Sequence, residues 1–189
     1  MIISLLSRRE APHDRKFKGI AHPEYPIEQT LRANDGAMHT LLLRASRRLR
    51  NAMDDARYLA GSRGVRVLGR SEGALRHATA TLSGRHATRV TVEPPCIRYA
   101  HGAQVLEPWM DVLVNVPERY GNLVQENFEE RRGTLRRLDR HGGAIVLEGE
   151  APLACLLGYA DWLRDLTEDE PNVATWLSRY LPLDRGPHA

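Results

Sequence analysis

The stretch from Leu106 to Leu166 restricts the fold most strongly, because its hydrophobic period alternates between that of strands and that of helices. Trp109 to Val116 alternates apolar and polar residues, which predicts a strand with one buried face. Pro117 ends this strand and suits the first turn of a helix, where Glu118 is favourable at the positive end of the helix dipole. We therefore expect a helix directly after the strand.

The rest of this stretch completes a recognisable unit. A stripe at helical spacing is formed by Tyr120, Val124, Asn127/Phe128 and Arg131, and Gly133 stands where a C-terminal glycine cap belongs. Two strands around a glycine turn, a helix and a last strand are then expected at Thr134–Arg140, Ala144–Glu150, Leu153–Leu166 and Val173–Tyr180. The order strand-helix-strand-strand-helix-strand is that of a ferredoxin-like split unit.

Several short motifs in this region resemble a known family. They are Glu107-Pro108, Pro117-Glu118-x-Tyr120, Arg131-Arg132-Gly133, Pro152-Leu153 and Gly158-Tyr159-Ala160-x-x-Leu163-Arg164-x-Leu166-Thr167. With these residues, the chain from Leu106 onward resembles domain V, the last core domain of the elongation factor G family of translational GTPases. There are two departures. The family usually has a basic, glycine-rich turn where this chain has Glu168-Asp169-Glu170-Pro171, and the step at Tyr120-Gly121 is one residue tighter than usual.

The preceding region resembles a shortened copy of the same unit. A strand is expected at Met38–Ala45, a helix from a Ser46 cap to Gly61, and a strand at Val65–Leu68. A second helix ending near Gly84 and a strand at Thr88–Glu93 follow. This region also resembles, more weakly, domain III of the same family, and of the LepA and BipA relatives in which domain V follows directly. The residues that carry this second resemblance are Gly69, Val90, Val92, Pro95 and Tyr99.

These patterns predict an α+β protein of two ferredoxin-like split units, the first of them shortened. We expect an extended basic arm with little regular structure at residues 1–36, because prolines and glycines interrupt it. The domain III-like unit is expected at 37–100 and the domain V-like unit at 106–189.

Charge is the main indication of a partner. The net charge is +3, and Lys16 and Lys18 are the only lysines, so nearly every cation is arginine, whose fork suits phosphate. One cluster is Arg44, Arg47, Arg48 and Arg50, and a second is Arg131, Arg132, Arg136 and Arg137, followed by Arg140. The resemblance implies the ribosome, with its RNA and proteins, as partner, and the second cluster supplies the phosphate contacts that we expect.

Nucleotide chemistry is not expected. No G-x-x-x-x-G-K-[ST] motif occurs in the 189 residues, so the phosphate cradle of a GTPase is missing from them. The eight histidines and two cysteines have no spacing typical of a metal site, and no cofactor or metal is expected. The sequence thus favours a non-catalytic, cytoplasmic ribosome- or RNA-binding protein, with no membrane partner. The acidic run Glu168–Glu170 keeps an alternative open, a protein-interaction or assembly subunit that reuses the fold.

A third, less favoured hypothesis is a serine hydrolase. Gly69-Arg70-Ser71-Glu72-Gly73 fits the G-x-S-x-G elbow, between a strand and a helix. In this interpretation Ser71 is the nucleophile, and its partners are Asp139 or Asp161 and His141 or His188. The competing interpretation is that Ser71 caps the helix, and it is favoured because such hydrolases place several parallel strands before the elbow.

Overall fold

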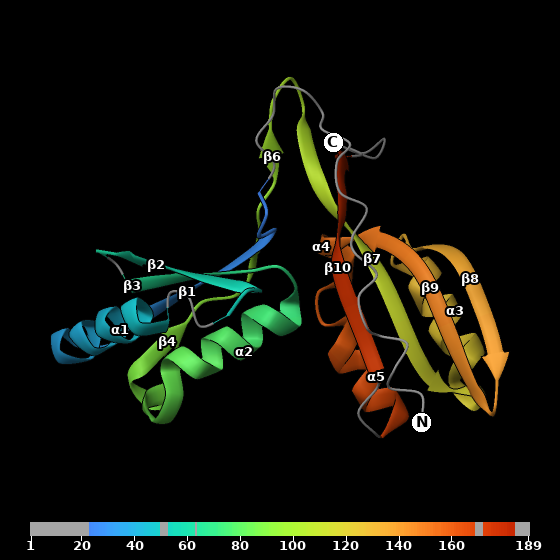
Figure 1. Cartoon of the computed structure of the whole chain (residues 1–189), viewed down its shortest axis with the longest axis horizontal. Helices are drawn as coiled ribbons and strands as arrows, with labels where there is room; N and C mark the ends of the chain where they lie inside the picture. The colour runs from blue at the N-terminus through green and yellow to red at the C-terminus, as the bar shows by residue number, and fades with distance from the viewer. Residues whose placement is uncertain (1–22, 50–52, 63, 169–171, 184–189) are drawn as a thin grey trace.

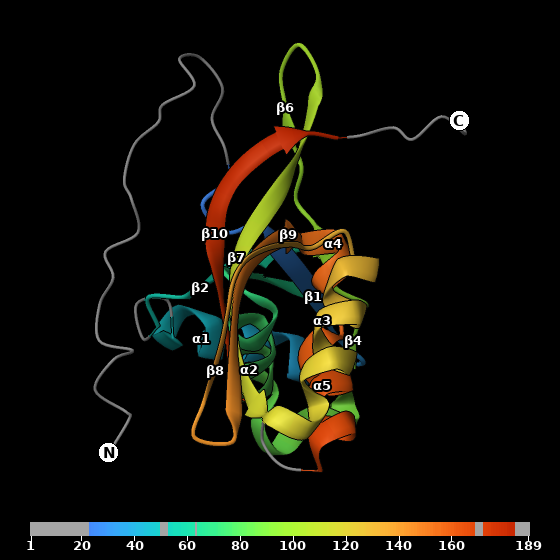
Figure 2. The ribbon, with the colours of Figure 1, turned by 90° about the vertical axis from the view of Figure 1, so that its right-hand side faces the viewer.

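The computed structural model describes residues 23–49, 53–62, 64–168 and 172–183. Two α+β units lie side by side, each a sheet with its helices on one face (Figures 1 and 2). The prediction of two ferredoxin-like α+β units is confirmed.

The first unit is a complete split β-α-β unit. Its elements are β1 (Ile27–Ala33), α1 (Gly36–Leu49), β2 (Ala56–Gly61), β3 (Gly64–Gly69), α2 (Glu72–Ser83), the 3-10 helix η2 (Gly84–Arg89), β4 (Val90–Val92) and β5 (Cys96–Ile97). The antiparallel sheet has the order β2-β3-β1-β4, and β5 also pairs with β1.

The second unit has the same connectivity. Its elements are β7 (Val105–Pro117), η3 (Glu118–Tyr120), α3 (Gly121–Glu130), β8 (Thr134–His141), β9 (Ala144–Pro152), α4 (Leu153–Leu156), α5 (Tyr159–Thr167) and β10 (Asn172–Pro182). The order β10-β7-β9-β8 corresponds, strand for strand, to that of the first sheet. The linker strand β6 (Ala100–His101) pairs with the start of β7, and this hairpin projects from the body of the molecule (Figure 1).

Two element predictions in the first unit are wrong. Met38–Ala45 belongs to helix α1, not to a strand: Met38, Leu42 and Ser46 are buried at four-residue spacing, and the Asp35 carboxylate accepts the Met38 N–H at 2.7 Å as an N-terminal cap. Ser46 is therefore no cap; its hydroxyl donates to the Leu43 carbonyl within α1. The continuous apolar run Leu41–Leu43 in the middle of this helix hides its period in the sequence.

The second wrong element is the helix predicted to continue to Gly61. Ala56–Gly61 forms strand β2, in which Ala56 and Tyr58 are buried and Arg57 between them is half-buried. In the sequence, the apolar residues Ala56, Leu59 and Ala60 also have the spacing of a helical stripe. The strand is favoured because β2 can pair with β3 along its whole length in a tight hairpin.

The prediction of an arm with little regular structure at residues 1–36 is wrong for Ile27–Ala33, which form a strand. Ile27–Ala33 is β1, which lies in the sheet between β3 and β4, and Ile27 and Leu31 are fully buried. The first unit is thus not shortened, since β1 is the strand that the sequence prediction lacked. The arm's basic residues before Pro23 lie outside the described residues.

The end of helix α3 also differs in detail from the expectation. Arg132, not Gly133, adopts the left-handed conformation, with a φ of 62°. The Gly133 N–H donates to the Phe128 carbonyl at 2.9 Å, which completes a Schellman-type end. A Cβ on Gly133 would lie 2.4 Å from that carbonyl oxygen, so close approach, and not a positive φ, requires glycine there.

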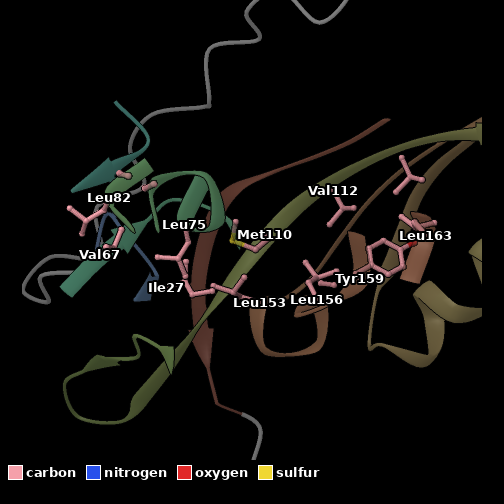
Figure 3. Packing of buried hydrophobic residues seen from close by; sticks show 14 of the residues in the cluster. Ile27, Val67, Leu75, Leu82, Met110, Val112, Leu153, Leu156, Tyr159 and Leu163 are labelled. Atoms are coloured by element: carbon pink, nitrogen blue, oxygen red, sulfur yellow. The ribbon is translucent and has the colours of Figure 1, made fainter. Parts of the chain in front are cut away.

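One hydrophobic core runs through both units. Ile27 and Leu75 of the first unit lie next to Leu153 and Met110 of the second (Figure 3). Polar contacts cross the same boundary, since Glu72 accepts the Gly158 N–H at 2.9 Å. The shared core fixes the two sheets against each other.

Candidate RNA and partner interface

The candidate interface is the face of the second sheet that carries no helix, which we call the open face (Figure 2). Along β7 the even-numbered residues from Met110 to Val116 are buried against the helices, so the odd-numbered residues point to the open face. The register places Asp111 of β7 opposite Glu150 of β9. Both carboxylates belong to this face, and both residues are at least nine-tenths buried.

Arg136 binds both of these carboxylates. Its guanidinium donates to Asp111 Oδ1 at 2.6 Å and also to Glu150. Burial alone would lower the pKa of Arg136, but the charges of Asp111 and Glu150 outweigh it and raise that pKa. Arg179 of β10 donates to the other oxygen of Glu150, so two arginines share this carboxylate.

Strict alternation along β8 predicts Arg136 and Arg137 on opposite faces, and the structure contradicts this. The register of β8 against β9 shifts between Leu135 and Arg137, which marks a β-bulge. The extra residue at the bulge turns Arg136 to the open face. Arg137, which is paired with Glu148 across the ladder, lies there as well.

Arg132 and Arg137 differ in what they contact. Arg132 donates to Glu107 Oε1 at 3.2 Å, and Glu107 is only 2% exposed. Arg137 pairs with Asp139 at 2.6 Å and keeps a side chain that is 60% exposed. The exposed fraction is 44% for Arg132 and 46% for Arg136, and Arg131 is half-buried. Arg137 is therefore the most accessible cation of the predicted set.

Arg131 is held inside the second unit. It donates to Asn127 Oδ1 at 2.8 Å and to the Cys155 carbonyl at 2.7 Å, and its guanidinium lies 5.3 Å from the centre of the Tyr159 ring. The Tyr159 ring stacks on Trp162 in turn. These contacts join α3 to the α4–α5 segment.

The structure thus places Arg132, Arg136 and Arg137 beside carboxylates, whereas Arg131 is held by an amide oxygen, a carbonyl and an aromatic ring. The sequence reasoning missed the residues that neutralise Arg132 and Arg136, namely Glu107, Asp111 and Glu150, together with the third open-face arginine, Arg179. The alternation pattern of β7 could have placed Glu107 and Asp111 on the same face. The positions of Glu150 and Arg179 next to these residues could not be predicted in this way, because they depend on which strands are neighbours in the sheet.

Ser71 is a helix cap. Its backbone is extended, and its hydroxyl oxygen accepts the Ala74 N–H at 3.2 Å. Asp161 binds Arg76 and Arg164, and hydrogen bonding from Arg76 lowers its pKa. His141 lies in the second unit, on β8, and His188 lies outside the described residues. The structure does not assemble the triad of the hydrolase hypothesis from its described members.

A metal-binding cluster and a membrane-spanning helix are both absent from the part of the chain that the structure describes. No group of three or more His, Cys, Asp or Glu residues there is placed to hold a metal ion. None of its helices combines the length and apolarity needed to cross a membrane.

The comparisons with known proteins concern the second unit. Residues 104–188 match the family model described as Elongation factor G C-terminus. The second unit is an elongation factor G C-terminal-like domain.

Individual relatives agree with this assignment. The chain is 31% identical to Elongation factor 2 of Methanopyrus kandleri over 83 residues, 44% of this chain and 6% of the relative. It is 30% identical to Elongation factor 2 of Thermococcus kodakarensis over 93 residues, 49% of this chain and 12% of the relative. It is 34% identical to Elongation factor G of Cytophaga hutchinsonii over 79 residues, 42% of this chain and 11% of the relative. The chain spans about an eighth or less of these relatives.

The motifs of the elongation factor G C-terminal-like domain are in contact in the structure. Glu107 of the Glu-Pro motif binds Arg132 of the Arg-Arg-Gly motif, and Arg131 of the latter packs on Tyr159 of the Gly-Tyr-Ala motif. Gly158, with a φ of 73°, provides the left-handed residue before α5. These motif residues contact one another and stabilise the domain, so their presence in the sequence is explained by folding and does not require a bound ligand.

Proposed function

We propose that this chain is a non-catalytic ribosome- or RNA-binding relative of the C-terminal domains of elongation factor G, without GTPase activity. The observation that carries the proposal is the match of the second unit to the elongation factor G C-terminus, in a sequence that has no nucleotide-binding loop. The first unit, with the same connectivity and directly before it, takes the place of domain III. The proposed partners are ribosomal RNA and proteins in the cytoplasm.

Within this proposal the phosphate contacts lie on the cluster Arg131, Arg132, Arg136 and Arg137. Arg137 is the principal contact, because its side chain is the most exposed of the set and its one ion pair among the described residues is with Asp139, which is itself 44% exposed. Exposed ion pairs are weak, so a phosphate can replace Asp139 at little cost. Arg132 and Arg136 contribute their remaining N–H groups, and Arg131 holds the helix end that presents them.

Co-sedimentation with purified ribosomes over a salt series tests the proposal. Binding should weaken steeply with salt, because each neutralised phosphate releases counterions. Arg137→Glu should reduce the bound fraction strongly. Arg140→Glu is the matched control, since Arg140 is also exposed on β8 and contacts Asn122 of α3 on the side of the sheet that carries the helices.

Two results would contradict the proposal. The first is a wild-type protein that does not co-sediment with ribosomes at low salt, and the second is equal binding by the two variants. Calorimetry that shows micromolar GTP binding would contradict the second part of the proposal, the absence of GTPase activity.

The alternative is a protein-interaction or assembly subunit. The observation that favours it is the neutralisation of the open face, where Arg132, Arg136 and Arg179 are each bound to a buried carboxylate. The acidic residues Glu168, Asp169 and Glu170 add negative charge where the family is usually basic. If the chain binds the ribosome, changing these three residues to Gly or Arg should strengthen ribosome binding. If the chain is a protein-interaction subunit, the same changes should leave ribosome binding unchanged.

A further inference from the structure

A second surface, in the first unit, combines an apolar floor with arginines that form no ion pair among the described residues. Helices α1 and α2 lie next to each other below the sheet (Figure 1), and a groove of about 410 Å³ runs between α1 and the end of α2. It is lined by Met38, Leu41, Leu42, Arg44, Ala45, Arg48, Leu49, Leu82 and His86. We call it the α1 groove.

The floor of the α1 groove is aliphatic. Met38, Leu42 and Leu82 are almost fully buried and form its base. Leu41 is 43% exposed, one of the few large apolar side chains of the described chain to be so. An apolar side chain placed against Leu41 would remove this surface from water, which the hydrophobic effect favours.

The rim of the α1 groove is basic. Arg44 and Arg48 follow one another at four-residue spacing, so they line the same side of α1, and His86 of η2 also lines the groove. Helix α1 carries no acidic residue, and no carboxylate is among the described residues that line the groove. In the described part of the chain, neither arginine has a carboxylate within ion-pair distance, unlike the arginines of the open face.

We propose that the α1 groove docks an acidic amphipathic helix of a protein partner. Leucine-like residues at i, i+3 and i+4 of that helix would cover Leu41 and the aliphatic floor, and flanking Asp or Glu residues would pair with Arg44 and Arg48. Charge complementarity favours this occupant, because a phosphate backbone satisfies the arginines but leaves the Leu41 side chain exposed to water. The inference is independent of the proposed ribosome contact at Arg137, which lies in the other unit.

The test uses a fluorescein-labelled peptide of about 18 residues, long enough to form a helix, with a leucine stripe and glutamates at the other positions. Fluorescence anisotropy should show saturable binding to the wild-type protein, and a peptide with lysine in place of glutamate should not bind. Leu41→Ser and the double variant Arg44→Glu, Arg48→Glu should each lower the affinity at least about tenfold, or 1.4 kcal/mol.

The chain offers matched controls for both changes. Leu59 of β2 is 41% exposed but lies outside the groove, so Leu59→Ser should bind as the wild type does. Arg47 is exposed on α1 and does not line the groove, so Arg47→Glu should also leave the affinity unchanged. Circular dichroism checks that each variant is folded.

Three outcomes would overturn the inference. One is the absence of peptide binding by the wild type. Another is equal weakening by Arg47→Glu and by the double variant, together with competition by a single-stranded RNA, which would make α1 a general phosphate surface. The last is a dimer in sedimentation velocity that Leu41→Ser dissociates, which would make a second copy of this chain the occupant.

Discussion

Replacing Arg132 by glutamate should destabilise the protein far more than replacing Arg137. Arg132 is the hydrogen-bonding partner that the structure shows for the Glu107 side chain, and Glu107 is 2% exposed. A buried carboxylate that loses its partner typically costs 3–5 kcal/mol. Arg132 is itself 44% exposed, so water can partly replace it and the lower end of that range applies. We therefore expect about 3 kcal/mol for Arg132→Glu, which also places a second negative charge beside the first.

The same change at Arg137 should be nearly silent. The side chain of Arg137 is 60% exposed and that of its partner Asp139 44%, and such solvent-accessible pairs are worth about 0–1 kcal/mol. Chemical denaturation followed by circular dichroism measures both free energies of unfolding, and a thermal scan should show Arg132→Glu melting about 6–12 °C lower. Arg132→Glu therefore cannot report on RNA binding alone, whereas Arg137→Glu can.

Two results would refute this reasoning. If Arg132→Glu and Arg137→Glu are equally stable, Glu107 does not depend on Arg132. If Glu107→Gln in the Arg132→Glu background does not restore at least part of the lost stability, the loss does not come from the unpaired carboxylate. The isosteric amide keeps the shape of the side chain and removes the charge that needs a partner.

Three further predictions concern the helix cap, the boundary between the units and the core. Ser71→Ala should lower the free energy of unfolding by about 1 kcal/mol through the lost bond to Ala74, and a lost esterase activity at unchanged stability would instead favour the hydrolase. Asp161→Asn should cost about 0.5–1 kcal/mol at pH 7 by weakening the pair with Arg76. Because the pKa of Asp161 is lowered in the folded state, this stabilisation is present above the ordinary pKa of 3.8 and is lost as the pH falls below it. A difference in free energy of unfolding between wild type and Asp161→Asn that persists in urea denaturation at pH 2 would contradict the ion pair. Gly149→Ala should cost about 1–3 kcal/mol in the same assay, since its Cβ would lie 2.6 Å from the Phe128 ring and 2.7 Å from the Thr134 carbonyl oxygen, and an unchanged stability would show that the core can yield there.

The second unit could be predicted from the sequence because its patterns are local. The alternation in β7, the glycine pair at the β8–β9 turn and the stripe of α5 each lie within a few residues of one another. Gly142 and Gly143 both have positive φ, as a tight hairpin turn requires. The period of the side chains therefore determined the elements and their order.

The first unit was predicted less well because two of its segments fit more than one period. Leu41, Leu42 and Leu43 form a continuous apolar run, which is compatible with a strand or a helix, and Ala56–Gly61 has apolar residues at both spacings. The Asp35 cap was the local evidence for the helix that was overlooked. Strand pairing of β2 with β3, a contact outside the segment itself, decided the second case.

The candidate site shows most clearly which properties follow from the sequence and which follow from the tertiary structure. The sequence by itself determined that four arginines cluster after α3, that Ser71 stands at a helix start, and that the 189 residues hold no nucleotide-binding loop. Only the tertiary structure decided what Arg132 and Arg136 contact, because Glu107, Asp111 and Glu150 reach these two arginines from other strands. The bulge at Arg136 and the groove beside α1 likewise arise from packing between elements. Periodicity acts along the chain, whereas neutralisation and burial of a charge depend on residues that the fold brings together from far apart in the sequence.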